Sequence, residues 1–212
     1  MNNVLCIFPK DCTTEFLSPV YETIVSTYFA TGLLGDPTVD DDYLEKLCLE
    51  ASQADSIIFI GHGSSRALYG INFNEIICEE NGNIDIFSGK RIILFSCKSI
   101  DFIKHFKLNN AIGFGLVPTS LIDTQSGKNF HNLSIGDLSV EDLAFIQECI
   151  VRIWQNSLKE SDLFDVHKFY NAFSFYTNSE IVNCLLNHKS TPNYRLIADV
   201  LYYLKEDMDY VR

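Results

Sequence analysis

The sequence lacks the long apolar runs and the basic amino-terminal segment that membrane-spanning and secreted chains carry. No apolar stretch approaches the roughly 20 residues that a membrane-spanning helix needs, and the first four residues include no basic residue of the kind that opens a secretory signal. Basic residues are also few, since 16 Lys and Arg stand against 28 Asp and Glu for a net charge of −12. Phosphate backbones select basic surfaces, so this balance argues against a nucleic-acid partner. We therefore expect a cytoplasmic protein that binds neither nucleic acid nor a membrane.

The seven cysteines lack the spacings of a metal site or of a disulfide framework. Their number is odd, no pair forms C-x-x-C, and none stands at zinc-ligand spacing from a histidine. The chain also has neither G-x-G-x-x-G nor G-x-S-x-G in a strand–turn–helix setting. This absence argues against a small-molecule binder or another hydrolase on a flavodoxin-like sheet. We therefore predict no metal, no cofactor and reduced cysteines, most of them buried as small apolar residues.

Apolar runs alternate with helical patterns over the first half of the chain. Short β-branched and aromatic runs at 4–8, 57–60, 92–95 and 111–117 predict buried strands. Helical spacing of apolar residues between several of these runs predicts an α/β fold with a mostly parallel sheet and helices on both faces. Residues 64–90 carry no such pattern and are predicted to be mostly irregular, with a hairpin or a loop.

From residue 139 onward the pattern predicts helices alone. Apolar residues at helical spacing predict helices within 143–154, 166–173 and 180–186, and Thr191-Pro192 is predicted to open a last helix. We therefore divide the chain into an α/β core at 1–138 and a helical region at 139–212. This helical region is expected to pack on the core or to continue the same domain, and it could dock a protein partner.

A histidine and a cysteine each follow one of the predicted buried strands. His62 follows the run at 57–60, and Cys97 follows the run at 92–95, 35 residues later. Catalytic groups gather at the carboxyl ends of parallel strands, so we expect the two side chains at one edge of the sheet. A free thiol with a pKa near 8.5 is only a few per cent thiolate at pH 7. A histidine within reach can take the thiol proton and return it to a leaving amine, so the pair predicts a cysteine nucleophile and its base.

Three segments resemble a known family. Ile-Ile-Phe-Ile-Gly-His-Gly-Ser-Ser at 57–65, followed by Leu-Tyr-Gly at 68–70, resembles the histidine segment of caspase-like (clan CD) cysteine peptidases. Ile-Ile-Leu-Phe-Ser-Cys-Lys-Ser at 92–99 resembles their cysteine segment, and Ala-Ile-Gly-Phe-Gly at 111–115 resembles the strand that follows it. Bacterial CHAT-type domains are the most similar members, and the resemblance covers about residues 4–120.

The resemblance implies a caspase–haemoglobinase-like three-layer sandwich with the activity of a cysteine endopeptidase. Such an enzyme would cut one or a few partner proteins after a sensor or another partner activates it. Carried over, His62 is the general base and acid, Cys97 is the nucleophile, and the backbone N–H groups of Gly63 and Cys97 hold the oxyanion. No acidic third member is evident. Members of this family that cleave after basic residues place an acid two positions before the cysteine, where this chain has Phe95. A preference for substrates with Lys or Arg before the bond that is cut would therefore need another acid, such as Asp123.

Other interpretations stay open. The same fold could be a catalytically inactive protein-interaction module, although an inactive site is free to lose either His62 or Cys97. Cys12 is a rival nucleophile because a helix amino terminus lowers a thiol pKa, but no histidine is near it in the sequence. The remaining histidines lie outside the two site strands and are predicted to be surface or capping residues; they are His105, His131, His167 and His188.

Overall fold

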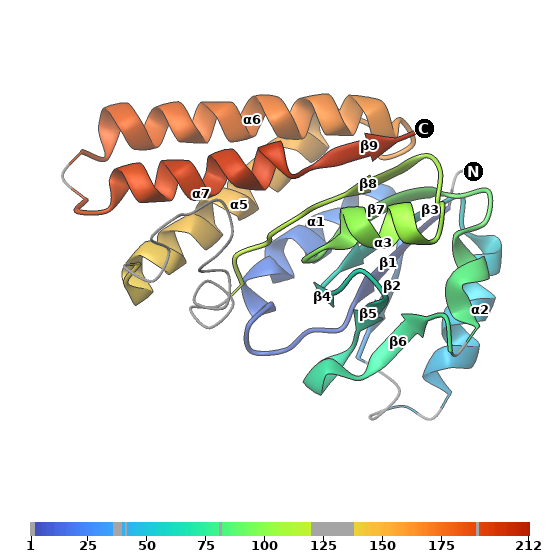
Figure 1. Cartoon of the computed structure of the whole chain (residues 1–212). Coiled ribbons are helices and arrows are strands. Elements are labelled where there is room, and N and C mark those ends of the chain that lie inside the picture. The colour runs from blue at the N-terminus through green and yellow to red at the C-terminus, as the bar shows by residue number, and fades with distance from the viewer. Residues whose placement is uncertain (1–2, 36–39, 41, 81, 120–137, 190) are drawn as a thin grey trace.

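A mostly parallel six-stranded sheet forms the centre of the protein (Figure 1). The computed structural model describes residues 3–35, 40, 42–80, 82–119, 138–189 and 191–212. The strand order is β2-β1-β3-β7-β8-β9, and β9 runs antiparallel to β8 at one edge. The strands are β1 Val4–Phe8, β2 Thr31–Leu34, β3 Ser56–Ile60, β7 Arg91–Phe95, β8 Ala111–Gly113 and β9 Asp209–Val211. The predicted α/β fold with a mostly parallel sheet is confirmed.

Helices pack on both faces of this sheet because successive strand side chains point to opposite faces. In β7, Ile93 and Phe95 pack with α1 Ser18–Tyr28, α5 Val140–Glu160, α6 Val166–Asn187 and α7 Tyr194–Glu206. The alternate residues Ile92 and Leu94 pack with α2 Tyr43–Gln53 and α3 Ser99–His105 on the other face. The helices of the carboxyl-terminal region therefore share one hydrophobic cluster with the strands that carry the candidate site.

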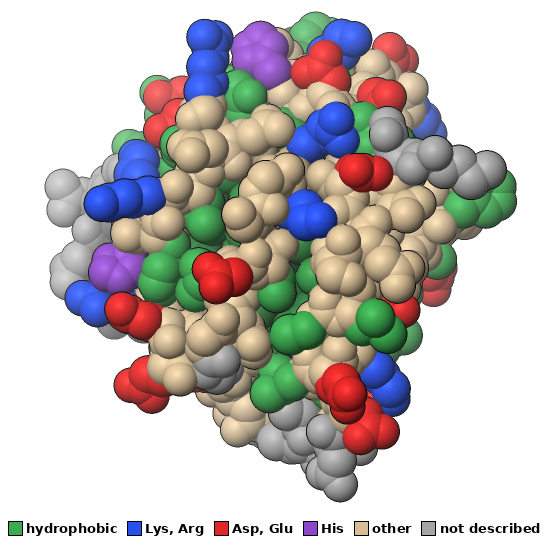
Figure 2. All heavy atoms as spheres, turned by 90° about the vertical axis from the view of Figure 1, so that its right-hand side faces the viewer, with side chains coloured by type: hydrophobic (Ala, Val, Ile, Leu, Met, Phe, Trp, Pro, Cys, Tyr) green, Lys and Arg blue, Asp and Glu red, His purple; other side chains and the backbone are tan. Residues whose placement is uncertain are grey.

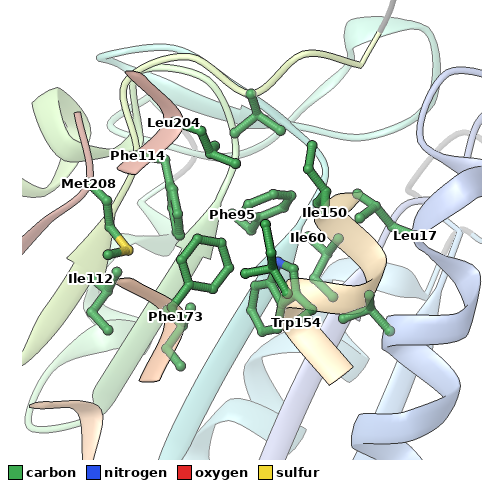
Figure 3. Close-up of a cluster of buried hydrophobic side chains, with 14 of the residues drawn as sticks. Leu17, Ile60, Phe95, Ile112, Phe114, Ile150, Trp154, Phe173, Leu204 and Met208 are labelled. Carbon is green, nitrogen blue, oxygen red and sulfur yellow. The ribbon is translucent and has the colours of Figure 1, made fainter. Parts of the chain in front are cut away.

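Aromatic rings fill the cluster beneath the cysteine strand (Figure 3). Trp154 of α5 is fully buried, and its ring meets Phe95 edge-on with centroids 5.3 Å apart. Phe169 and Phe173 of α6 pack against the same indole at 4.9 and 5.8 Å. Phe95 is therefore a core residue, and its ring has no exposed surface.

The segment between the two site strands is more regular than predicted. It forms a second, antiparallel sheet of β4 His62–Gly63, β5 Ala67–Tyr69 and β6 Glu75–Cys78, with single turns η2 Ile71–Phe73 and η3 Asn83–Phe87. The expected hairpin is present as β5 and β6, whereas the rest of the segment is more regular than the prediction of a mostly irregular chain. Strands of two to four residues are too short to show an alternation, and packing of Ile76 and Ile77 against the main sheet stabilises them instead.

The second half of the chain differs from the prediction in four further places. The helices predicted within 166–173 and 180–186 are one continuous helix, α6, and α7 begins at Tyr194, after Thr191-Pro192. The strand predicted over 111–117 ends at Gly113. The expectation of helices alone after 139 is wrong at the carboxyl terminus, because Asp209–Val211 pairs with β8 as an edge strand.

The described surface carries charges of both signs. On the face drawn in Figure 2, acidic and basic side chains are interspersed, with small groups of apolar side chains between them. This face therefore has no single-sign surface that would select a ligand by charge. Within the described ranges, no helix has both the length and the apolar character that crossing a membrane requires.

Candidate active site

The histidine and cysteine segments touch at the carboxyl edge of the main sheet. β3 and β7 are hydrogen-bonded neighbours, with Ile60 opposite Phe95. Beyond them, Gly61 donates its N–H to the Phe95 carbonyl at 3.1 Å. A Cβ on Gly63 would lie 2.5 Å from Ser96 Oγ and 3.1 Å from the Cys97 carbonyl oxygen, so only glycine allows this approach. The structure therefore brings His62-Gly63 and Ser96-Cys97 together, as their places after adjacent parallel strands predict.

The N–H of Gly63 is directed away from β5. Ser64 donates its N–H to the Ala67 carbonyl at 2.8 Å, which makes the next pair, Gly63 and Leu68, a non-hydrogen-bonded pair of the antiparallel ladder. The Gly63 N–H therefore points outward at the edge of the small sheet, away from β5. An N–H that is directed away from its own strand ladder is one requirement of an oxyanion-hole donor.

Cys97 sits in a tightly held turn between β7 and α3. Its side chain is half-buried, and Sγ lies 3.3 Å from both the carbonyl oxygen and the N–H nitrogen of Val117. The fully buried hydroxyl of Ser99 supports this turn, because it accepts the Phe114 N–H at 2.8 Å and lies 2.6 Å from the Leu94 carbonyl oxygen. Cys97 is therefore at a fixed position on the backbone, with its thiol hydrogen-bonded to the segment after β8.

An acidic partner that the sequence did not reveal lies against His62. Nε2 of His62 is 2.9 Å from Oδ2 of Asp11 and 2.8 Å from Oγ1 of Thr13. The histidine side chain is 8% exposed and the aspartate side chain 16% exposed. Asp11 comes soon after β1, which neighbours β3 in the sheet, so the same edge that receives His62 also receives Asp11. The expectation that no acidic third member is evident is corrected by this pair.

The loop that holds Asp11 uses one carboxylate oxygen and leaves the other for the histidine. Oδ1 accepts hydrogen bonds from the backbone N–H groups of Thr13 and Thr14 at 2.8 and 3.0 Å, and from the Thr13 hydroxyl at 2.7 Å. Partial burial raises the pKa of the Asp11 carboxyl, but the Thr13 hydroxyl, the charge of His62 and these N–H groups outweigh it, so the pKa lies below its usual value. Asp11 is therefore an anion at neutral pH.

This hydrogen-bond pattern assigns the tautomer of His62. The Thr13 hydroxyl gives its proton to Asp11 Oδ1, so it can only accept from Nε2, as Asp11 Oδ2 also does. Nε2 therefore carries the proton, and in the neutral imidazole the lone pair lies on Nδ1. The nitrogen that is able to accept a proton from a thiol is Nδ1.

The depressed pKa of Asp11 predicts a loss of stability in acid. Because the folded carboxyl binds protons more weakly than the unfolded one, its contribution is present above the unfolded pKa and is lost as the pH falls through the folded value. Asp11→Asn should therefore flatten the fall in unfolding free energy below about pH 4, by about 0.2–1 kcal/mol for a partly exposed pair. Urea unfolding at stepped pH measures this. Asp199→Asn, which removes an exposed carboxylate from α7, is the control, and equal slopes for both variants would contradict the prediction.

Cys12 lies closer to a histidine in space than its sequence position indicates. It is exposed, and it stands between Asp11 and Thr13, the two residues whose side chains contact His62. Cys12 therefore stays a rival nucleophile that experiment has to separate from Cys97. Of the other histidines, His105 and His167 are exposed and His188 is the half-buried carboxyl cap of α6. His131 and Asp123 lie outside the described residues.

The described residues offer no metal site, and comparisons with known proteins give no match. Within the described ranges, no three side chains of His, Cys, Asp or Glu gather in a way that could hold a metal ion. The chain matches no protein-family model, no curated protein and no solved structure. The function therefore has to be argued from the site itself.

Proposed function

We propose that the protein is a caspase-like cysteine endopeptidase with Cys97 as nucleophile and His62 as general base and acid. In this mechanism Nδ1 takes the Cys97 proton, and the thiolate attacks the carbonyl carbon of a peptide bond. The carbonyl oxygen becomes an oxyanion beside the N–H of Gly63, with the N–H of Cys97 as second donor. The imidazolium returns the proton to the leaving amine, and water then hydrolyses the thioester.

The close approach of Gly63 to Ser96-Cys97 is the observation that carries this proposal. A glycine whose N–H faces away from its own hairpin, placed beside a half-buried cysteine and preceded by a histidine, supplies three parts of an acyl-transfer site. The Asp11 carboxylate adds an orienting group, since it sets the histidine tautomer in the same way as the acid of other nucleophile–base–acid sites.

A specific observation favours a second candidate, the catalytically inactive interaction module. The thiol of Cys97 hydrogen-bonds the backbone of Val117 on the segment after β8. In the peptidase of the first proposal, the same arrangement is a resting state that a protein partner or signal converts, because catalytic hydrogen bonds are often long before substrate binds. A resting state predicts weak activity of the isolated chain, and one or a few partner proteins as substrates.

Alkylation of each cysteine by iodoacetamide, followed by mass spectrometry across pH, tests the proposal. Cys97 is expected to react well below pH 8, and His62→Ala should slow it by up to about 100-fold near pH 6.5, where an ordinary thiol is about 1% ionised. Exposed Cys48 on α2 is the internal reference thiol, and His105→Ala at an exposed site is the matched control. A Cys97 that reacts no faster than Cys48, or a fast Cys12 instead, would contradict the assignment.

Cleavage products in cells distinguish the two candidates. Cells that express the wild-type chain should accumulate one or a few new protein amino termini that Cys97→Ala does not produce. An interaction module would keep its cellular effect in Cys97→Ala, because a thiol is not needed for docking.

A further inference from the structure

A large aromatic side chain stands exposed beside the candidate site. The ring of Phe73 lies on the imidazole of His62, with centroids 4.9 Å apart and a tilt of 37°. Phe73 is nevertheless 62% exposed, so only one side of its ring is covered. Tyr69 meets the Phe73 ring edge-on at 6.0 Å. Single exposed apolar side chains are common on protein surfaces. Phe73 differs from most of them in its backbone conformation, which is left-handed.

The backbone pays a conformational cost to present Phe73. Asn72 and Phe73 both have left-handed backbone angles, with φ of 56° and 59°. The Gly70 N–H donates to the Asn74 carbonyl at 2.7 Å, and the backbone and side-chain N–H groups of Asn74 donate to the Ile71 carbonyl. These hydrogen bonds close the loop around Asn72 and Phe73. Left-handed geometry is unfavourable for a bulky residue, and such outliers gather at functional sites. A glycine would make this turn without strain, but it would place no ring on His62.

Tyr69 is held in place by hydrogen bonds within the hairpin. Its hydroxyl donates to Ser64 Oγ at 3.0 Å, and the same oxygen accepts the N–H groups of Arg66 and Ala67 at 3.1 Å. Movement of the Tyr69 ring away from this position would break its hydrogen bond to Ser64. Tyr69 and Phe73 together make a pre-formed aromatic surface next to the imidazole.

This aromatic surface is within reach of a substrate held at Cys97. The acyl carbonyl oxygen would sit at the N–H of Gly63, which follows His62 directly in the chain. The Phe73 ring lies 4.9 Å from the imidazole of that same histidine, and an extended peptide advances about 3.3–3.6 Å per residue. The subsite proposed below takes the side chain of the first or second acyl residue on the exposed side of Phe73.

Resting on the proposed function, we propose that Phe73 and Tyr69 form an apolar subsite. The subsite makes the enzyme prefer substrates with a large apolar or aromatic side chain at the first or second residue before the bond that is cut. Phe73 is then the specificity-determining residue, and it selects an apolar substrate side chain. A peptidase with an acid at the position of Phe95 would instead be expected to select a basic substrate side chain.

Peptidyl chloromethyl ketones, which alkylate the nucleophile, test the subsite. Acetyl-dipeptide reagents with phenylalanine at the first or second acyl residue are compared with the dialanine reagent, and modification of Cys97 is followed by mass spectrometry. We expect at least one phenylalanine reagent to react about tenfold faster than the dialanine reagent, a usual gain for an apolar contact. Phe73→Ala should reduce this ratio to near one, and Phe73→Tyr should preserve it.

The chain offers a matched control in Phe29. This phenylalanine is 94% exposed and also has a left-handed φ, of 49°, but it lines a hollow with Asn3 and Val4 at the opposite end of β1 from Asp11. Phe29→Ala should therefore leave the ratio unchanged. If Phe73→Ala instead accelerates every reagent including iodoacetamide, Phe73 covers the site as a lid and the subsite is refuted. A wild-type ratio near one with fast iodoacetamide labelling of Cys97 refutes the subsite alone, whereas an inert Cys97 refutes the proposed function as well.

Discussion

Replacing Trp154 with alanine is expected to lower the free energy of unfolding by about 3–5 kcal/mol, the cost of deleting a large buried aromatic side chain. Trp154 has no exposed surface and contacts three other buried rings, so nothing can move in to fill the space without rearranging them. Domains of this kind are stable by about 5–15 kcal/mol, so the loss is a large fraction of the total. Urea unfolding followed by far-UV circular dichroism measures it, because the substitution removes the only tryptophan of the chain.

Two further variants define what the loss means. Trp154→Phe should cost much less, because most of the apolar contact remains and the indole N–H has no hydrogen-bond partner among the described residues. Phe175→Ala removes a 66% exposed ring from α6 and should change stability by less than about 0.5 kcal/mol. A loss below about 1 kcal/mol for Trp154→Ala would mean that the helical region packs only loosely on the sheet. Phe95 is two residues before Cys97 and packs on Trp154. Trp154→Ala should therefore also slow the alkylation of Cys97.

The main sheet is predictable from the sequence because its strands are buried on both faces. Runs such as Ile57–Ile60 and Ile92–Phe95 have no polar alternation, which is the signature of a parallel strand between two layers of helices. The short strands are a different case. β9 has only three residues and exists because β8 offers an unpaired edge, so its own sequence carries no signal. The polar segment of α6 around Asn178-Ser179 suggested a break, but packing on both sides of it keeps the helix continuous.

The candidate site is predictable in part for the same reason. His62 and Cys97 follow strands that the sequence identifies, and adjacency of parallel strands brings their ends together. Asp11 also follows an identifiable strand, so the signal for it was present. An aspartate before an apolar helical pattern is also a common helix cap, so the sequence alone does not distinguish the two roles. Only the pairing of β1 with β3 shows that its loop faces His62, 51 residues away.

The orienting role of Asp11 predicts a loss of Cys97 reactivity in Asp11→Asn. The asparagine keeps the shape and an acceptor oxygen for Nε2 but removes the negative charge that stabilises an imidazolium. The asparagine keeps the hydrogen bond, so the loss is that of the charge interaction alone, about 0.2–1 kcal/mol for a partly exposed pair. We therefore expect alkylation of Cys97 near pH 6.5 to fall about two- to fivefold, less than in His62→Ala.

The pH profile separates this role from a merely structural one. Above about pH 9.5 an ordinary thiol is already ionised, so the wild type and Asp11→Asn should converge there if Asp11 acts through His62. A variant with a collapsed loop would instead differ at every pH. Thr13→Val, which removes the hydroxyl that bonds both Asp11 and Nε2, should give a smaller loss with the same convergence, while Asp199→Asn should give none. If Asp11→Asn stays within about twofold of the wild type near pH 6.5, the carboxylate only fixes the loop after β1.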